Sequence, residues 1–444
     1  MPFASSPDAA VPLAAPDATA AAATPRWSDV YIAALARAVS GCGDMLAATA
    51  LALILVARGE SGLAVAGILL AAAVPLVVVG PIAGRLADRV DSRTLIVSVG
   101  FVQVGICVAL AFATRPILII ALVAMLAIGL AITSPTMSAL TPLMVGRQNL
   151  AKAGGIAQTA ATIGMLAAPA LGGVLVGAFG SRVPLLIDAG TYLSIPIAGL
   201  LIRTRRGGRF RTVPAAASVS IDDAAATGRR QPAFRMRSDA LVWPLMVMIG
   251  AVVGAISAVN VIDVFFIRQT LHASATVYGL VAATWIAGMV FGAVVRGRQR
   301  RDDVGTARGL LLMNLATGVA ITVAGLMPHV GWVVPLWLLG GVLNGMENVA
   351  IGVILGSRVP PEVRGHASAI FNSIAGGANA FGYLAGGALL AIASPRLLVI
   401  MCGLAGVTAA AIFGVPLTRA MRRERAAYVR AVADDPLPRT IAAV

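Results

Sequence analysis

Long apolar segments recur along almost the whole chain, and they decide what it can fold into. Each has about 20 residues or more, the length that an α-helix needs to cross a bilayer. The composition agrees, because 59% of the residues are hydrophobic and 12% are charged. Soluble domains have roughly 45–50% apolar residues and about 25% charged residues. These patterns predict an all-α integral membrane protein and exclude a water-soluble fold.

The apolar segments fall into two sets of six. The first set is predicted to form helices at 30–57, 63–87, 93–113, 116–143, 154–179 and 184–202. The second set is predicted at 241–266, 275–296, 308–328, 332–356, 366–392 and 397–417. The chain is therefore expected to form twelve transmembrane helices in two six-helix bundles, at 29–202 and 241–417.

Three polar segments lie outside the predicted bundles: a tail at 1–28, a basic linker at 203–240 and a basic tail at 418–444. The first tail is predicted to be disordered. It carries Asp8 and Asp17 and has neither a basic start nor an apolar core, so it does not fit a signal peptide.

The distribution of positive charge predicts the orientation in the membrane. The chain has 34 Lys and Arg residues. Arg37 lies within the first helix, and the loops on one side hold only Arg58, Arg115, Arg182, Arg268 and Arg396. The rest lie in the tails, the linker and the loops on the other side, which marks that side as cytoplasmic. We expect a cell inner-membrane protein with both termini in the cytoplasm, whose net charge of +15 serves topology and lipid headgroups rather than nucleic acid.

The two sets of helices share a common plan. Gly84 and Gly292 stand 208 residues apart, and each precedes a run of arginines. Gly172 and Gly386 stand 214 residues apart, and each is followed by another glycine. Two pseudo-symmetric bundles are implied, an arrangement in which transporters place the substrate between the repeats and rock one against the other.

The turn between the second and third predicted helices carries a dense charge motif. GPIAGRLADRVDSR contains Gly84, Asp88, Arg89 and Arg93 in the order GxxxDRxxxR. It resembles the signature of the major facilitator superfamily of secondary transporters, which lies in the cytoplasmic turn between transmembrane helices 2 and 3. Asp91 departs from the family pattern, where glycine is usual.

Asp88 stands at the C-terminal end of a helix, where the helix dipole disfavours a carboxylate. Arg89 and Arg93 can compensate, and the resemblance adds the N-terminus of the eleventh helix. Gly80 and Gly84 share a face with Asp88 and permit a close approach of that helix. The functional interpretation is a cytoplasmic gate, a latch made when the transporter opens outward and broken when it opens inward. The alternative is a permanent turn and topology signal.

The fifth predicted helix carries a second motif, GIAQTAATIGMLAAPALGG. Gly155, Gly164, Pro169, Gly172 and Gly173 match a pattern found in the exporter branch of the superfamily, and the resemblance implies export. Pro169 is expected to kink the helix, because it cannot donate a backbone hydrogen bond.

Small residues of this helix form a stripe that permits close helix packing. Gly164, Ala168 and Gly172 make up the stripe, and Gly288 and Gly292 of the eighth helix offer a possible partner face. Ordinary packing of membrane helices is the alternative reading of the stripe.

Ionisable residues at membrane depth are functional candidates, because burying charge in a bilayer is unfavourable. Arg37 and Asp44 lie seven residues apart on the first helix and so share a face. Glu347 lies within the tenth helix and Asp263 near the outer end of the seventh. Asp188 opens the sixth helix and is expected to be structural.

The resemblance implies that helices 1, 4, 7 and 10 line the central cavity, which would bring Arg37, Asp44, Asp263 and Glu347 toward the substrate. A carboxylate in a low-dielectric cavity can take up and release a proton near neutral pH. Asp44 and Glu347 are the proton-coupling candidates and Asp263 is the third, with Arg37 as charge partner of Asp44. Alternatively, Arg37 and Asp44 form a structural ion pair and Asp263 is merely solvated.

Three further segments narrow the resemblance: RAVSGCGDMLAATALALIL, LLIDAGTYL and RVPPEVRGHASAIFNSIAG. They resemble the branch that contains enterobactin exporters and macrolide efflux pumps. The implied function is proton-coupled export of small amphipathic molecules, drugs or secondary metabolites. The alternatives are a dedicated siderophore or metabolite exporter, an uptake facilitator of the same fold, and a membrane sensor or partner-binding protein that does not transport.

No enzymatic constellation is present in the sequence. It has no phosphate-binding loop, no metal-ligand spacing and no nucleophile–base pair outside the spans. Neither a cofactor nor a metal is expected. The expected partners are a small-molecule substrate, protons and membrane lipids, and the chain is expected to act as a monomer.

Overall fold

The computed structural model describes residues 25–207, 239–299, 302–360 and 363–434. The first half contains α1 (Trp27–Ala57), α2 (Gly62–Arg89), α3 (Ser92–Phe112), α4 (Pro116–Val145), η1 (Arg147–Asn149), α5 (Leu150–Leu166), α6 (Ala168–Phe179), α7 (Arg182–Tyr192) and α8 (Ser194–Leu201). The second half contains α10 (Val242–Ile256), α11 (Val259–Phe265), η3 (Phe266–Thr270), α12 (Ala275–Gly297), α13 (Asp303–Leu326), α14 (Val330–Arg358), α15 (Arg364–Leu389) and α16 (Pro395–Asp434).

The predicted fold class is confirmed. Eleven stretches of the described chain are helical, long and apolar enough to cross a membrane. α15 is the twelfth, with 26 residues. Its hydropathy is lower because small and polar side chains, among them the exposed Asn372 and Ser373, follow one face.

Three of the predicted spans are each built from more than one helix. The fifth is broken at Ala167, between α5 and α6, two residues before Pro169. The sixth is broken at Leu193, between α7 and α8. The seventh is broken near Ser257, whose hydroxyl contacts Asn379 Oδ1 of α15 at 2.6 Å. The kink that Pro169 predicts is therefore present.

The last helix is longer than the sequence predicts, because α16 continues past 417 to Asp434. An ion-pair cluster holds this extension. Arg358, at the end of α14, contacts Glu424 of α16 at 2.6 Å, Asp303 of α13 at 2.9 Å and Asp239 at 3.6 Å. One guanidinium thus ties the end of α14 to the start of α13, to α16 and to the segment that precedes α10.

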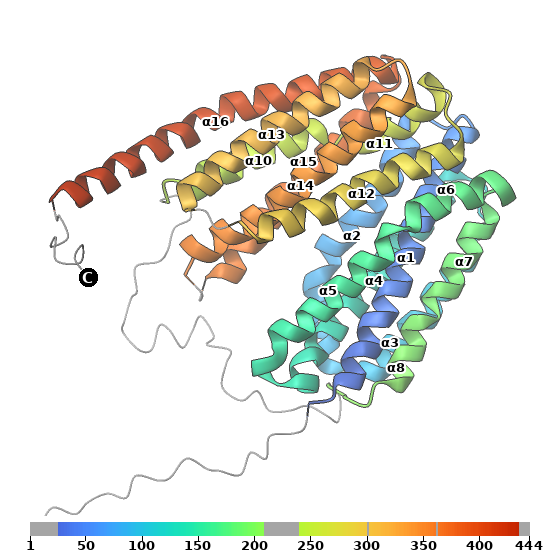
Figure 1. Ribbon diagram of the computed structural model, residues 1–444. Helices are drawn as coiled ribbons and strands as arrows, with labels where there is room; N and C mark the ends of the chain where they lie inside the picture. The colour runs from blue at the N-terminus through green and yellow to red at the C-terminus, as the bar shows by residue number, and fades with distance from the viewer. Residues whose placement is uncertain (1–24, 208–238, 300–301, 361–362, 435–444) are drawn as a thin grey trace, which may run out of the picture.

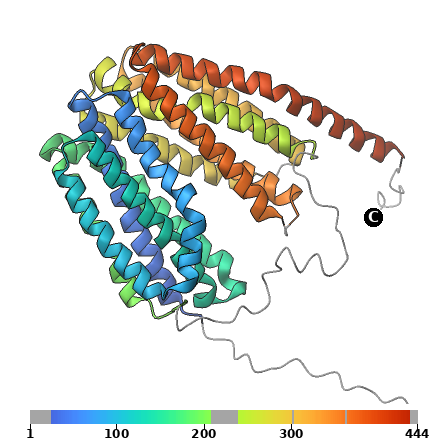
Figure 2. The same ribbon diagram turned by 180° about the vertical axis from the view of Figure 1, so that it is seen from behind.

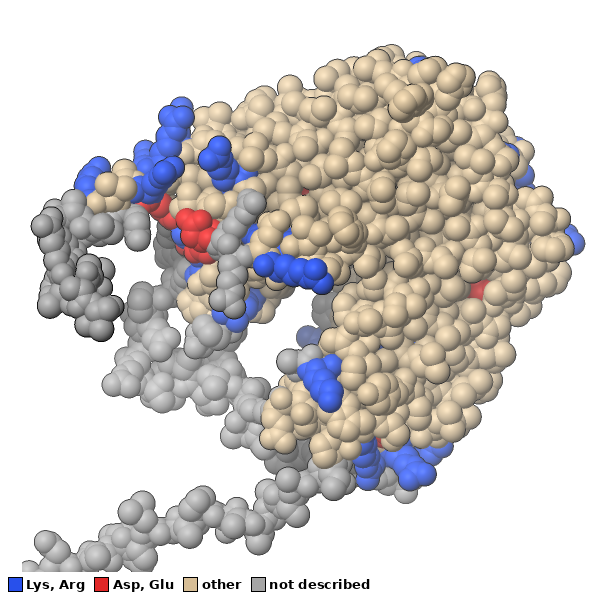
Figure 3. Space-filling model, viewed as in Figure 1, with Lys and Arg blue, Asp and Glu red and all other residues tan. Residues whose placement is uncertain are grey.

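The two halves form separate bundles that meet at one end only. Figures 1 and 2 show α1–α8 and α10–α16 leaning together at this closed end and diverging toward the opposite, open end. The principal contacts between the bundles join α2 to α15 and α6 to α12. Figure 3 shows Lys and Arg gathered around the open end and a hollow between the bundles there.

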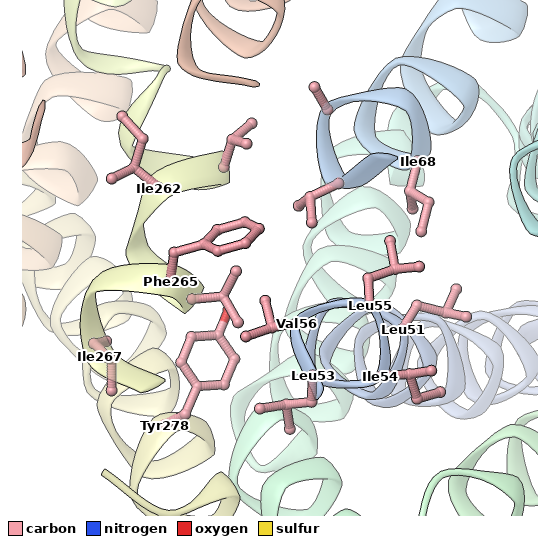
Figure 4. Packing of buried hydrophobic residues seen from close by; sticks show 14 of the residues in the cluster. Leu51, Leu53, Ile54, Leu55, Val56, Ile68, Ile262, Phe265, Ile267 and Tyr278 are labelled. Carbon is pink, nitrogen blue, oxygen red and sulfur yellow. The ribbon is translucent and has the colours of Figure 1, made fainter. Parts of the chain in front are cut away.

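A hydrophobic cluster spans the boundary at the closed end. Figure 4 shows Val56 of α1 opposite Phe265 of α11 and Tyr278 of α12, with Leu53 and Leu55 beside it. Each of these side chains is at most 8% exposed. Because the cluster draws residues from both bundles, burial of apolar surface favours the closed state of this end.

Most of the predicted tail at 1–28 and of the predicted linker at 203–240 lies outside the described residues. Where the linker begins, it is attached to α1. Asp29 Oδ2 accepts hydrogen bonds from the backbone N–H groups of Arg203 and Thr204 at 3.2 and 3.0 Å. The last residues of the predicted tail at 418–444, from 435 onward, also lie outside the described chain.

Candidate transport site

The stripe of the fifth span packs on α1. A side chain of any size at Gly164 would collide with the backbone of Ala38, and one at Gly172 would press on Leu46 and Thr49. Ala168, between the two glycines, is fully buried. The stripe thus seats α5 and α6 against the first helix of their own bundle.

The prediction that this stripe packs on the glycine face of α12 is wrong. Gly288 and Gly292 of α12 lie against the backbone of α14 at Leu338 and Val342. In turn, Gly341 and Gly345 of α14 lie against the backbone of α12. The spacing of small residues identifies a packing face but not the helix that meets it, which explains the error.

Two members of the motif, Pro169 and Gly173, do reach the other bundle. Gly173 of α6 lies against Gly279 of α12, and a Cβ on Gly173 would lie 2.9 Å from the Cα of Gly279. A Cβ on Gly279 would in turn collide with Pro169 and Gly173. Gly155, at the other end of the motif, has no atom within 4 Å of its would-be Cβ. The motif therefore combines packing within one bundle with closure between bundles.

The charge motif lies at the open end of α2. Arg93 donates a hydrogen bond to the carbonyl of Leu200 at the end of α8, and Asp91 caps α3 by accepting from the Thr94 N–H at 3.2 Å. Gly84 and Asp88 belong to α2, but their surroundings lie outside what the structure describes. Arg89, the last residue of α2, is exposed.

α2 and α15 do not meet beside this motif. A Cβ at Gly80 would find open space. Gly382 and Gly386 of α15 instead pack on Ser257 and Ala258 of their own bundle, and Gly387 meets Gly62 at the closed end. In this open state the face proposed for the latch is separated from the eleventh helix.

Asp44 and Arg37 have different partners. Asp44 Oδ1 accepts a hydrogen bond of 2.6 Å from the Tyr192 hydroxyl, whereas Arg37 donates to Ser134 at 3.2 Å. The expected ion pair between Arg37 and Asp44 is not formed in the described structure. The physical reason is distance along the helix, because seven residues correspond to about 10 Å of rise.

Asp188, which the sequence predicts to be structural, lies near Asp44. It is 1% exposed, and its carboxylate accepts a hydrogen bond from the Thr191 hydroxyl at 3.2 Å. It stands one helical turn before Tyr192, the hydrogen-bond partner of Asp44. Gly43 brings α1 so close to α7 that a Cβ there would overlap Thr191 and Asp188.

Asp44, which is half-buried, and Asp188, which is buried, therefore lie close together where α1 packs on α7, in the interior of the first bundle. This position differs from the expected one, since α7 packs on α1, α3, α6 and α8 rather than across the central space. The LLIDAGTYL segment, which holds Asp188 and Tyr192, was the available signal in the sequence.

Glu347 occupies a comparable position in the second bundle. It is 9% exposed, and Asn314 of α13 donates to its Oε1 at 3.0 Å. α13 packs mainly on α10, α14 and α16 of its own bundle. Glu347 therefore points into the bundle interior rather than toward the space between the bundles.

Asp263 lies apart from these groups, on α11. It lines a cavity of about 190 Å³ together with Asn260, Trp285 and Trp337. Arg37 lines a different cavity, of about 220 Å³, between α1, α4 and α5. Of the four residues expected along one substrate path, these two therefore border open space in separate bundles.

Two helical bundles that close at one end and open at the other form an arrangement found in membrane transporters. The family model for the Major Facilitator Superfamily matches residues 33–267 and 242–431. The chain belongs to that superfamily, whose members are transporters and not enzymes.

Similar curated proteins include exporters. The chain is 22% identical to macrolide efflux protein A of Enterococcus faecalis over 58% of this chain and 79% of that protein. It is 25% identical to the enterobactin exporter EntS of Citrobacter koseri over 66% of this chain and 68% of that protein.

Solved structures share the fold. The nucleoside transporter NupG matches with a TM-score of 0.66 and 13% identity over 87% of this chain and 98% of that one. A bacterial homologue of the human lysosomal transporter Spinster, solved inward-facing and unoccupied, matches with a TM-score of 0.64 and 16% identity over 89% and 95%.

Proposed function

We propose that this protein exports small amphipathic molecules, drugs or secondary metabolites, by exchanging them for protons through alternating access. The observation that carries the proposal is the contact of Gly173 with Gly279. It belongs to a motif resembling that of exporters, and it brings the two bundles together at one end. The likeness to macrolide efflux protein A and to EntS supports export as the direction.

The orientation follows from charge. Lys and Arg gather around the open end, where α1 begins and α16 ends. Positive residues mark the cytoplasmic side. We assign the open end and both termini to the cytoplasm, so the conformation is inward-open and the closed end faces outward. One chain supplies both bundles, and it acts as a monomer.

Proton coupling is assigned to the acidic pair. An isolated carboxylate buried in a low-dielectric interior is strongly unfavourable, and two adjacent carboxylates add mutual repulsion. The described structure gives Asp44 and Asp188 no cationic partner. One proton removes the repulsion between the two carboxylates and leaves a single negative charge, with the Tyr192 hydroxyl holding Asp44 in place. Glu347, held by Asn314, is the second candidate.

α1 connects this pair to the motif of the fifth span. One side of α1 meets Asp188 and Thr191 through Gly43, and another meets Gly164 through Ala38. A change of charge between α1 and α7 therefore changes how α1 seats against α5 and α6. α6 carries Gly173, so α1 links the proton site to the helices that close the outer end.

The direction of flux tests this proposal. Inverted membrane vesicles that contain the protein, given an acidic lumen, should accumulate a macrolide or enterobactin above the level of vesicles that lack it. Accumulation only in right-side-out vesicles would identify an uptake facilitator. Binding without movement in either preparation would identify a sensor.

A dedicated siderophore exporter is the second candidate, and the likeness to EntS favours it. A competition experiment separates it from a broad exporter. If enterobactin uptake into inverted vesicles is unaffected by an excess of macrolide and of hydrophobic amines, the transporter is dedicated to one class of substrate.

A further inference from the structure

The cavity beside Asp263 has the chemistry of a cation-binding site. It lies between α11, α12, α13 and α14, and Asp263, Trp285, Trp337 and Asn260 line it among aliphatic side chains. Its volume of about 190 Å³ is below the roughly 300–1,000 Å³ of pockets that enclose a drug-sized ligand. It can therefore hold one end of a larger molecule.

Asp263 brings an unsatisfied negative group into this cavity. Its Oδ1 is buried and accepts no hydrogen bond. Buried polar atoms in native proteins nearly always have a partner, so an exception calls for an explanation. The described salt bridges all involve Arg358, which lies at the open end, and none neutralises Asp263. A cationic ligand would supply both the missing charge and the missing hydrogen bond.

Two indole rings complete the site. Trp285 and Trp337 meet edge to face, with centroids 6.4 Å apart and planes at 65°. Both rings line the same cavity as Asp263, their planes point in different directions, and aromatic faces attract ammonium groups. Gly340 makes room for the arrangement, because a Cβ there would lie 2.5 Å from the Trp285 ring. The Trp285 ring therefore packs directly against the α14 backbone at Gly340.

We propose that this cavity binds the ammonium group of an amphipathic organic cation, with Asp263 as counter-ion and the two tryptophans as aromatic walls. That the bound cation is the exported cargo rests on the proposed function. The apolar body of the ligand extends out of the cavity past Asn260, because this lining residue is exposed. A bare metal cation fits poorly, since hard cations require several oxygen ligands.

Equilibrium binding to the purified full-length protein tests the site. The probes are 3-phenylpropylammonium, whose N–H groups can donate to Asp263 Oδ1, and its neutral isostere, in which carbon replaces the nitrogen. We expect the cation to bind at least about tenfold more tightly than the isostere. The ratio of the two affinities should stay the same when sodium replaces a bulky inert cation in the buffer at constant ionic strength. Equal affinities, or loss of the preference when sodium replaces a bulky inert cation, would overturn the proposal.

Variants locate the binding to this cavity. Asp263→Asn should remove the preference for the cation and leave the isostere within about twofold of the wild type, while Asp263→Glu retains part of the preference. Trp337→Leu should weaken cation binding about three- to thirtyfold. Trp332→Leu is the matched control, because Trp332 lies on the same helix and is 62% exposed, and it should change nothing.

Parallel losses of both probes in Asp263→Asn and Trp337→Leu would contradict the proposal, because they would indicate disturbed packing rather than a cation site. If Asp263→Asn fails to fold, the ratio of the two affinities in Trp337→Leu decides. Cation binding without transport in vesicles would leave this site standing and remove the exporter proposal. Transport without any preference for the cation would support the exporter proposal and contradict the cation site.

Discussion

Gly173 and Gly279 lie in backbone contact across the boundary between the two bundles. The contact requires glycine on both sides, because a Cβ on either residue would collide with the backbone of the other helix. It stands beside the hydrophobic cluster of Val56, Phe265 and Tyr278, which seals the same end. A small contact area between two rigid bundles is what a reversible gate needs.

Enlarging Gly279 should therefore impair closure of this end. We expect Gly279→Ala to reduce transport at least about tenfold, because the α6 and α12 backbones can no longer approach. Gly155→Ala is the control within the same motif, since a Cβ there meets nothing within 4 Å. Substrate flux, normalised to folded protein, checks both. Equal sensitivity at the two positions would show that the motif acts as a whole rather than through the contact between bundles.

Neutralising Asp44 should uncouple transport without unfolding the protein. Asp44→Asn preserves an oxygen that can accept the Tyr192 hydrogen bond, so we expect near-normal folded yield, loss of gradient-driven export and partial survival of downhill exchange. Asp188→Asn should behave in the same way.

The partner of Arg37 gives this prediction a control. Because Arg37 donates to Ser134, Arg37→Gln should not restore any function or yield lost in Asp44→Asn. Recovery in the double variant would instead indicate the ion pair that the sequence predicts. Full gradient-driven export by Asp44→Asn and Glu347→Gln alike would exclude both residues from coupling.

The sequence sets the architecture but leaves the site open, and these residues show why. Hydropathy locates the spans, and Pro169 locates a break in one of them. Glycine spacing defines the face of α5 and α6 correctly, yet it cannot name α1 as the neighbour. The hydrogen bond of Asp44 with Tyr192 joins residues 148 positions apart, so no helical periodicity connects them. Arg37 and Asp44 share a face, but a shared face is not a contact.

Arg358 should stabilise the open end of the second bundle. It joins α14 to α13 and α16 through Asp303 and Glu424 with partly exposed side chains. We expect Arg358→Gln to lower stability by about 1–2 kcal/mol, less than for a fully buried pair because solvent screens the charges. Thermal unfolding in detergent measures the change. Arg422→Gln, an exposed neighbour on α16, is the control, and an equal effect there would contradict the role of the cluster.

Asp88→Asn should lower transport while leaving insertion and yield near normal. In the open state Gly80 faces no helix, so the latch can form only when the bundles converge at that end. The substitution therefore affects the outward-open state and not the one described. Labelling of a cysteine placed at the closed end reports that state, and it should decrease in the variant. Wild-type labelling and flux would remove the latch interpretation.

We propose that export is coupled to protons through Asp44 and Asp188, which lie close together between α1 and α7. The most direct measurement records substrate efflux and proton influx together, in proteoliposomes that hold wild-type protein or Asp44→Asn. We expect substrate efflux from wild-type vesicles to draw protons inward, and the substrate-dependent proton flux of Asp44→Asn to fall at least about tenfold. Substrate movement without protons in the wild type, or undiminished proton flux in Asp44→Asn, would contradict the claim.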